Sequence, residues 1–276
     1  MKVETIEQNY AVAKARYAEF GIDTDKAIAE LEKTPISLHC WQADDVTGFE
    51  SNSALTGGIQ ATGNYPGKAR NIDELRQDIE KVQTLLAGHH RLNLHEIYGE
   101  FGGKFVDRDQ VEVSHFQGWI DWAKEHNLKL DFNSTSFSHP KSGDLSLANP
   151  DKAIRDFWIE HTKRCRRIAD AMGKAQGDPC IMNIWVHDGS KDLTVERYRY
   201  RQILKESLDE ILAEDLPHMK SCLEAKLFGI GLEAYTVGSH DFFAGYCSKN
   251  NAIYTLDTGH YEPTENVSDM VSSLLL

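Results

Sequence analysis

Carboxylates, a lysine and an imidazole follow two short apolar runs late in the chain. Glu224 and Lys226 close the first run, and Asp257 and His260 follow the second, which covers 252–256. Residues two apart on a strand point to the same face, so Glu224 and Lys226 would both point inward. Carboxylates and an imidazole at neighbouring strand ends are suitable ligands for a divalent cation. The pattern therefore predicts a metal-dependent site on a β/α scaffold.

The ligand types restrict the choice of metal. Glu224, Asp257 and His260 offer two carboxylates and one imidazole, a set that suits Mn²⁺, Mg²⁺ or Co²⁺ better than structural Zn²⁺, which prefers thiolates. Three ligands are fewer than an octahedral site needs, so water or further residues would complete it. Two plainer interpretations stay open. Glu224 and Lys226 would form a buried ion pair that only orders the interior, or Asp257 would cap a turn beside a surface histidine.

Further candidates for binding a substrate follow other apolar runs. His95 is a candidate for acid–base catalysis or for contact with a substrate hydroxyl. Trp185 would form an apolar wall under a sugar ring, Asp188 would reach a hydroxyl, and Trp41 is a third substrate-binding candidate. The alternatives are a hydrogen-bonded core imidazole at His95 and ordinary packing at Trp185.

Strand and helix patterns alternate along the chain and would position these side chains. Alternation with helices of ten or more residues predicts parallel strands joined by right-handed crossovers. The carboxyl ends of parallel strands meet at one mouth, where active sites form in barrels. The expected strands are 36–40, 92–97, 128–132, 180–185, 221–228 and 252–256, and the expected helices are 71–86, 116–126, 152–172, 195–216, 240–249 and 264–275.

Six strand–helix units predict one α/β domain of the (β/α)₈ TIM-barrel type over 1–276, with an N-terminal helical extension at 1–34. A closed barrel needs eight units, so about six of eight would be present. A doubly wound sheet would also accommodate six strands, but no complete Gly-x-Gly-x-x-Gly motif follows a strand, and 229–231 comes nearest. The glycine-rich loop 56–67 is either an irregular connector or a lid, because it lacks the Gly-Lys-Ser/Thr of a phosphate loop.

Composition excludes several classes of protein. A formal net charge of −13 over 276 residues argues against nucleic acid and anionic membrane as partners. Five cysteines without CxxC spacing are typical of reduced thiols in a cytoplasmic protein. Residues 1–10 lack the apolar core of a signal peptide, and no apolar run approaches membrane-spanning length. A small neutral or cationic molecule is the expected partner.

Longer motifs closely resemble the L-rhamnose isomerases. The run His-Cys-Trp-Gln-Ala-Asp-Asp-Val-Thr-Gly-Phe-Glu at 39–50 is one of them, and Asp-Thr-Gly-His at 257–260 is another. The resemblance continues in order over essentially the whole chain. Its other segments are 56–70, 91–95, 130–133, 137–140, 182–185, 188–189, 224–231 and 263–265.

This resemblance implies a (β/α)₈ barrel related to xylose isomerase, usually a homotetramer. It implies that L-rhamnose and L-rhamnulose are interconverted by a metal-mediated hydride shift, typically with Mn²⁺ at two divalent sites. Glu224 then resembles a ligand of the structural metal, Asp257 the bridging ligand and His260 a ligand of the catalytic metal. Lys226 resembles the lysine that contacts a substrate oxygen, while His95 and Trp185 resemble pocket residues.

The sequence departs from the family pattern in two respects. Family members continue with a His, a Trp-Asp-Ser-Asp-His motif and a later Asp that complete both metal sites, and none of these occurs here. His187 also stands where the family usually has Pro. With the apolar end at 272–276, these departures lead us to expect an N-terminal portion of such an enzyme. The alternatives are a catalytically inert fragment, or another sugar isomerase or epimerase of the same superfamily.

Overall fold

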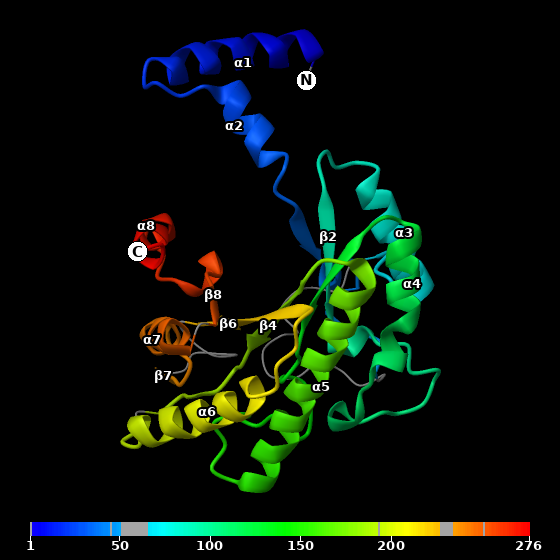
Figure 1. The fold of residues 1–276 in the computed structure, drawn as a ribbon, viewed down its shortest axis with the longest axis vertical. Coiled ribbons are helices and arrows are strands. Elements are labelled where there is room, and N and C mark those ends of the chain that lie inside the picture. The colour runs from blue at the N-terminus through cyan, green and yellow to red at the C-terminus, as the bar shows by residue number, and fades with distance from the viewer. Residues whose placement is uncertain (1, 45, 51–65, 193, 227–233, 251) are drawn as a thin grey trace.

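The computed structural model describes residues 2–44, 46–50, 66–192, 194–226, 234–250 and 252–276. Within them the chain forms an α/β fold whose parallel sheet curls into a half-barrel of six strands (Figure 1). The strands lie in the order in which the chain forms them, so each crossover joins neighbours, as the alternating pattern predicts. They are β1 (Ile36–His39), β2 (His90–His95), β3 (Lys129–Asn133), β4 (Cys180–Trp185), β6 (Met219–Glu224) and β8 (Ile253–Thr255).

A helix follows each strand of this sheet, as the sequence predicts. Asn71 and Asp151 cap two of these helices, because their side-chain oxygens accept hydrogen bonds from backbone N–H groups in the first turn. Gly177, with a φ of +64°, ends the 25-residue helix that Asp151 begins. The helices are α3 (Ile72–Gln83), α4 (Gln117–Glu125), α5 (Lys152–Gln176), α6 (Arg197–Leu212), α7 (His240–Asn250) and α8 (Val267–Leu274).

The hydrophobic core lies between the sheet and these helices. Helix α5 buries Trp158, Ile168 and Met172 in this core. Gly173 allows α5 to pack closely, because a Cβ atom at that position would lie 1.7 Å from the carbonyl oxygen of His218, just before β6. The close packing of α5 helps to fix the strands that carry the polar residues at the mouth.

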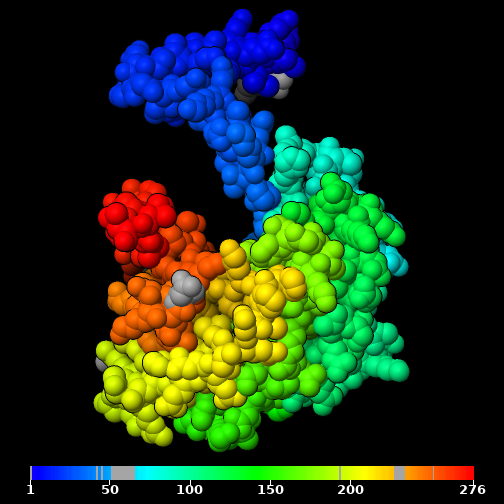
Figure 2. All heavy atoms as spheres, viewed as in Figure 1, coloured from blue at the N-terminus to red at the C-terminus, as the bar shows by residue number. Residues whose placement is uncertain are grey.

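The N-terminal helices α1 (Val3–Ala18) and α2 (Thr24–Leu31) project away from the half-barrel (Figures 1 and 2). Neither helix has a buried residue. Tyr10 and Lys14 of α1 bond to Asp25 of α2 and hold the two helices together. Among the described residues, no helix combines the length and apolar character that crossing a membrane requires.

A small antiparallel sheet was not predicted. It pairs β5 (Gly189–Ser190) with β7 (Tyr235–Thr236) beyond the carboxyl ends of β4 and β6. The glycine-rich loop 56–67 lies almost wholly outside the described residues. So do the glycines at 229–231 and the last two positions of the expected strand 221–228.

Candidate metal centre

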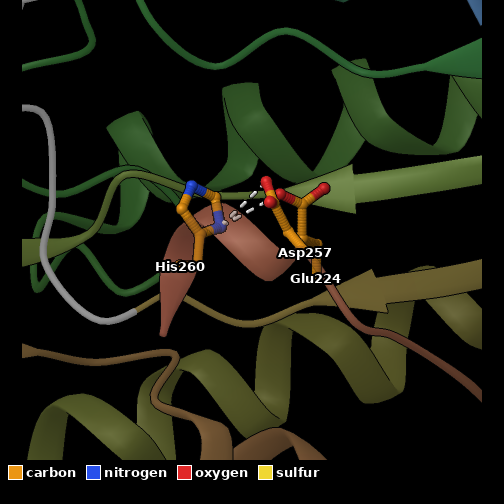
Figure 3. A group of neighbouring side chains, drawn as sticks. All are labelled: Glu224, Asp257 and His260. Carbon is orange, nitrogen blue, oxygen red and sulfur yellow. Dashed lines mark ion pairs between the residues drawn. The ribbon is translucent and has the colours of Figure 1, made fainter. Parts of the chain in front are cut away.

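Three potential ligands converge where β6 and β8 end (Figure 3). Glu224 is the last residue of β6, while Asp257 caps the start of the 3-10 turn η6 (Thr258–His260) after β8 and His260 ends that turn. Their ligand atoms all lie within 4.8 Å of one another. His260 Nδ1 is 3.2 Å from Glu224 Oε1 and 3.3 Å from Asp257 Oδ2. Across the described residues, this is the one group of three or more such side chains close enough to hold an ion.

Local structure explains the convergence. Glu224 pairs with Thr255 in the parallel β6–β8 ladder, so the segments after both strands begin side by side. Asp257 Oδ1 accepts a hydrogen bond from the Gly259 N–H at 2.7 Å and stabilises the turn that carries His260. Asp257 therefore caps the turn, as one of the plainer interpretations of the sequence expects. The cap uses only Oδ1 of Asp257, and Oδ2 faces the imidazole of His260.

The charges around His260 favour a cation at this position. Burial lowers the pKa of His260, but the hydrogen bond to Glu224 and the charge of Asp257 outweigh burial and raise the pKa above its usual value. The protonated Nδ1 can donate to the carboxylates or to the Ala225 carbonyl oxygen, which lies 3.0 Å away. Coordination of a metal ion by this imidazole would require the loss of a proton from the ring. The two carboxylates and one imidazole fit a divalent cation that prefers oxygen with some nitrogen.

A cavity of about 980 Å³ opens beside the three ligands. It is large enough for a monosaccharide. Its walls include His39, Trp41, His95, Phe137 and Trp185, together with Glu224, Asp257 and His260. The structure therefore brings Trp41, His95 and Trp185 together with the predicted ligands around one space.

His95 is buried in the cavity wall. Its ring lies 4.5 Å from the ring of Trp41, and its Nδ1 is 3.4 Å from Thr135 Oγ1. Burial lowers the pKa of His95 to about 3, so the ring is neutral at physiological pH. No other described residue makes a hydrogen bond with its Nε2. A neutral imidazole in this position can exchange a hydrogen bond with a ligand hydroxyl, but it does not carry a positive charge.

Trp185 and Lys226 lie next to the ligand group. The Trp185 ring stacks on His260 with an interplanar angle of 22° and meets Phe137 edge-on. Lys226 is only 1% exposed, and its Nζ lies 5.2 Å from the centroid of the Trp185 ring. The lysine is not among the residues that line the cavity. It therefore lies close to the cavity wall without forming part of it.

The structure places Asp188 away from the cavity, in contrast to the sequence expectation. Asp188 is fully buried, and its carboxylate accepts hydrogen bonds from the Ser146 N–H, the Ser146 hydroxyl and the Ala148 N–H at 2.5–2.8 Å. It is not among the residues that line the cavity. These contacts fix the loop that leads to α5.

Sequence reasoning missed Asn183 and Thr255. Asn183 on β4 donates a hydrogen bond to Glu224 Oε2 and accepts one from Thr255 Oγ1. A signal was present, because Asn183 is a polar residue in an otherwise apolar strand, two positions before Trp185 and therefore on the same face. Its partners could not be identified without the order of the strands.

Comparison with known proteins identifies the family. The family model described as L-rhamnose isomerase (RhaA) matches residues 4–276. The chain belongs to the L-rhamnose isomerase family. The L-rhamnose isomerase of Bacteroides thetaiotaomicron is 67% identical over 276 residues, which cover 100% of this chain and 66% of that protein. The enzyme of Mannheimia succiniciproducens is 50% identical, with 99% of this chain and 66% of that protein covered. This member of the family therefore spans slightly less than two thirds of either relative.

A solved structure supports the fold of this L-rhamnose isomerase family member. The crystal structure of D-psicose 3-epimerase with D-tagatose from Clostridium cellulolyticum H10 matches it with a TM-score of 0.53. The match covers 87% of this chain and 70% of that chain at 13% identity. At this low identity the likeness concerns the fold alone. It agrees with a parallel half-barrel of the TIM-barrel type.

Proposed function

We propose that this protein acts in the interconversion of L-rhamnose and L-rhamnulose as a metal-dependent aldose–ketose isomerase. The observation that carries the proposal is the convergence of Glu224, Asp257 and His260 beside a cavity with aromatic walls, in a chain that belongs to the L-rhamnose isomerase family. The names of the two relatives support the sugar, and the donor set supports the metal.

The proposed cation is Mn²⁺, with Co²⁺, Mg²⁺ or Zn²⁺ as alternatives. Glu224 would hold a structural ion, Asp257 would bridge two ions and His260 would hold a catalytic ion. When bound, such cations polarise neighbouring sugar oxygens and stabilise developing negative charge. The ligand atoms of the three side chains lie within 4.8 Å of one another, which supports a shared cation site, and the division between two ions is what the family resemblance implies.

The remaining residues would bind and orient the sugar. Trp41 and Trp185 offer flat apolar surfaces to a sugar ring, and the neutral His95 offers Nε2 to a hydroxyl group. Lys226 would fix a substrate oxygen, a role that the family resemblance implies and that requires its buried Nζ, 5.2 Å from the centroid of the Trp185 ring, to reach the cavity. In the proposed reaction a hydride moves from C2 to C1 of the opened aldose while a proton moves from O2 to O1. The walls therefore have to hold C1 and C2 in one orientation and exclude water.

Metal binding and ketose formation test this proposal together. Mn²⁺ binding is measured by the loss of the free-ion signal in electron paramagnetic resonance, and ketose formation from L-rhamnose is measured colorimetrically with added Mn²⁺. The 276-residue chain should bind Mn²⁺, and a variant carrying both Asp257→Ala and His260→Ala should lose that binding together with any ketose formation. Equal Mn²⁺ affinity in the two proteins would overturn the metal site. Binding without ketose formation would contradict isomerase activity in this chain and leave the metal site intact.

We also propose a cytoplasmic location and a homotetramer. Support for the location comes from the five cysteines, all of which are free and buried, as expected in a reducing compartment. Exposed apolar side chains on the N-terminal segment, such as Val12 and Phe20, support assembly because association would cover them. Light scattering on the eluting protein measures the mass directly, and a monomer would contradict the tetramer.

A further inference from the structure

A chain of hydrogen bonds crosses three strands and ends at the proposed ligand Glu224. The hydroxyl of Thr255 on β8 lies 3.0 Å from Asn183 Oδ1 on β4. The amide Nδ2 of the same asparagine bonds to Glu224 Oε2 on β6. All three side chains line the cavity. The strand that carries Glu224 therefore lies between the two strands that carry the other members of the chain.

The chemistry of the three groups allows one direction for these bonds. An ionised carboxylate only accepts, so Asn183 must turn its NH₂ group toward Glu224. The amide oxygen then faces Thr255, whose hydroxyl must donate. The Thr255 hydroxyl thus stabilises the orientation in which the NH₂ group of Asn183 reaches the carboxylate. Glu224 Oε2 is occupied by this contact, while Oε1 lies 3.2 Å from His260 Nδ1.

We propose that Asn183 and Thr255 are positioning residues that hold the Glu224 carboxylate with Oε1 turned toward Asp257 and His260. This inference rests on the proposed metal function of Glu224 and deepens it. Partners that orient ligands in this way typically change metal affinity by about 10- to 100-fold when they are removed. Asn183 contacts the ligand, and Thr255 acts through Asn183.

The competing explanation is a cross-strand link that only holds the sheet together. Substitutions at Thr255 separate the two roles, because valine keeps the branched shape and strand preference of threonine but lacks the hydroxyl. Thr255→Ser keeps the hydroxyl and loses a methyl group. A merely structural role predicts that Thr255→Val harms the protein no more than Thr255→Ser.

Mn²⁺ titration of the 276-residue chain, followed by electron paramagnetic resonance, measures the effect. We expect Thr255→Val to weaken Mn²⁺ binding about 10-fold and Asn183→Leu to weaken it by up to about 100-fold, with Thr255→Ser within about 2-fold of the original. Asn93→Leu is the matched control, since Asn93 is also a cavity-lining strand asparagine but bonds to Asn133. It should keep the original Mn²⁺ affinity. Circular dichroism confirms that each variant is folded.

Glu224→Gln separates a failure of this inference from a failure of the metal site. If Glu224→Gln leaves Mn²⁺ affinity unchanged, the metal assignment of Glu224 fails. If Glu224→Gln weakens binding and Thr255→Val does not, the positioning inference alone fails. Crystal structures of the metal-free chain add a readout that does not need the ion. The Glu224 carboxylate should turn in Asn183→Leu, and an unchanged orientation would overturn the inference.

Discussion

The imidazole of His260 lies 3.2 Å from the carboxylate of Glu224, although the two residues leave different strands of the sheet. The pairing of β6 with β8 brings them together, because the carboxyl ends of parallel strands share one edge. Asp257 Oδ2 lies 3.3 Å from the same imidazole nitrogen, and both carboxylates lie on one side of the ring (Figure 3). Two carboxylates that face one nitrogen create a negative site, which the imidazolium neutralises and which a divalent cation would neutralise more fully.

Mn²⁺ should therefore stabilise the folded protein. An ion that binds only the folded state at about 100 times its dissociation constant adds about 2.7 kcal/mol to the free energy of unfolding. For a chain of this size that corresponds to a rise in Tm of about 5–10 °C. Differential scanning fluorimetry with Mn²⁺, and then with excess chelator, measures the rise and its reversal. The Asp257→Asn variant should show little rise, and an equal rise in that variant would indicate that Mn²⁺ binds elsewhere.

Much of the fold could be predicted because each element carries its own pattern. Apolar runs such as 180–185 mark strands, and the capping residues Asn71 and Asp151 mark where helices begin. The small β5–β7 sheet has no such pattern. Its strands are two residues long and gain their hydrogen bonds from a partner distant in the sequence. Only the assembled half-barrel brings those partners together.

The site could be predicted in part for a similar reason. Residue type alone indicates that Glu224, Asp257 and His260 suit a cation, and their positions after apolar runs suggest one edge of a sheet. Residue type does not show where a buried carboxylate finds its partners. Asp188 looks like a contact for a sugar until the backbone N–H groups of the loop before α5 are seen around it. Asn183 looks like a minor polar residue until strand order places it beside Glu224.

Asp188→Asn should lower stability rather than weaken substrate binding. The buried carboxylate accepts three hydrogen bonds, and an amide in its place would direct an NH₂ group at backbone donors. A buried group left without a suitable partner costs about 1–3 kcal/mol, and more when charge is involved. Urea denaturation should show a loss of about 2–3 kcal/mol, while the KM for L-rhamnose stays near its original value. A large rise in KM at unchanged stability would return Asp188 to the substrate site.

His240 should support the turn that carries the candidate ligands. Its Nε2 donates to the His260 carbonyl oxygen at 2.7 Å, its Nδ1 accepts from the Tyr254 hydroxyl at 2.6 Å, and its ring packs against Tyr261. His240→Phe keeps the ring and loses both hydrogen bonds, so we expect a loss of about 1–3 kcal/mol in the free energy of unfolding.

The same variant should bind Mn²⁺ more weakly, because the backbone of His260 is no longer held. Tyr254→Phe is the matched comparison, since it removes only one of the two bonds, and its effects on denaturation and on Mn²⁺ titration should be smaller. Full Mn²⁺ affinity in His240→Phe, at reduced stability, would show that the histidine supports the fold without orienting the ligands.

His161 should make the protein less stable in acid. Its Nδ1 donates to the Arg108 carbonyl oxygen at 3.0 Å, and its Nε2 accepts from the Thr135 N–H at 3.2 Å. A proton on Nε2 would face that N–H and abolish the bond. Burial lowers the pKa of His161 to about 3. The charges of Arg108 and His139 act in the same direction as burial, and the charge of Asp107 acts in the opposite direction. The folded protein therefore keeps this imidazole neutral.

The direction of the pH effect follows from this difference in proton binding. The unfolded chain takes up the proton below about pH 6.5, whereas the folded chain does so only near pH 3. Acidification between these values thus favours unfolding, by about 1.4 kcal/mol per pH unit for each such histidine. Urea denaturation at several values between about pH 4 and 6 gives the dependence of the free energy of unfolding on pH. In His161→Gln the slope of this dependence should be smaller by the contribution of one proton. Burial lowers the pKa of His95 in the same way. Adding His95→Gln should therefore reduce the slope by the contribution of a second proton. An unchanged slope in His161→Gln would mean that the folded protein binds the proton as readily as the unfolded chain.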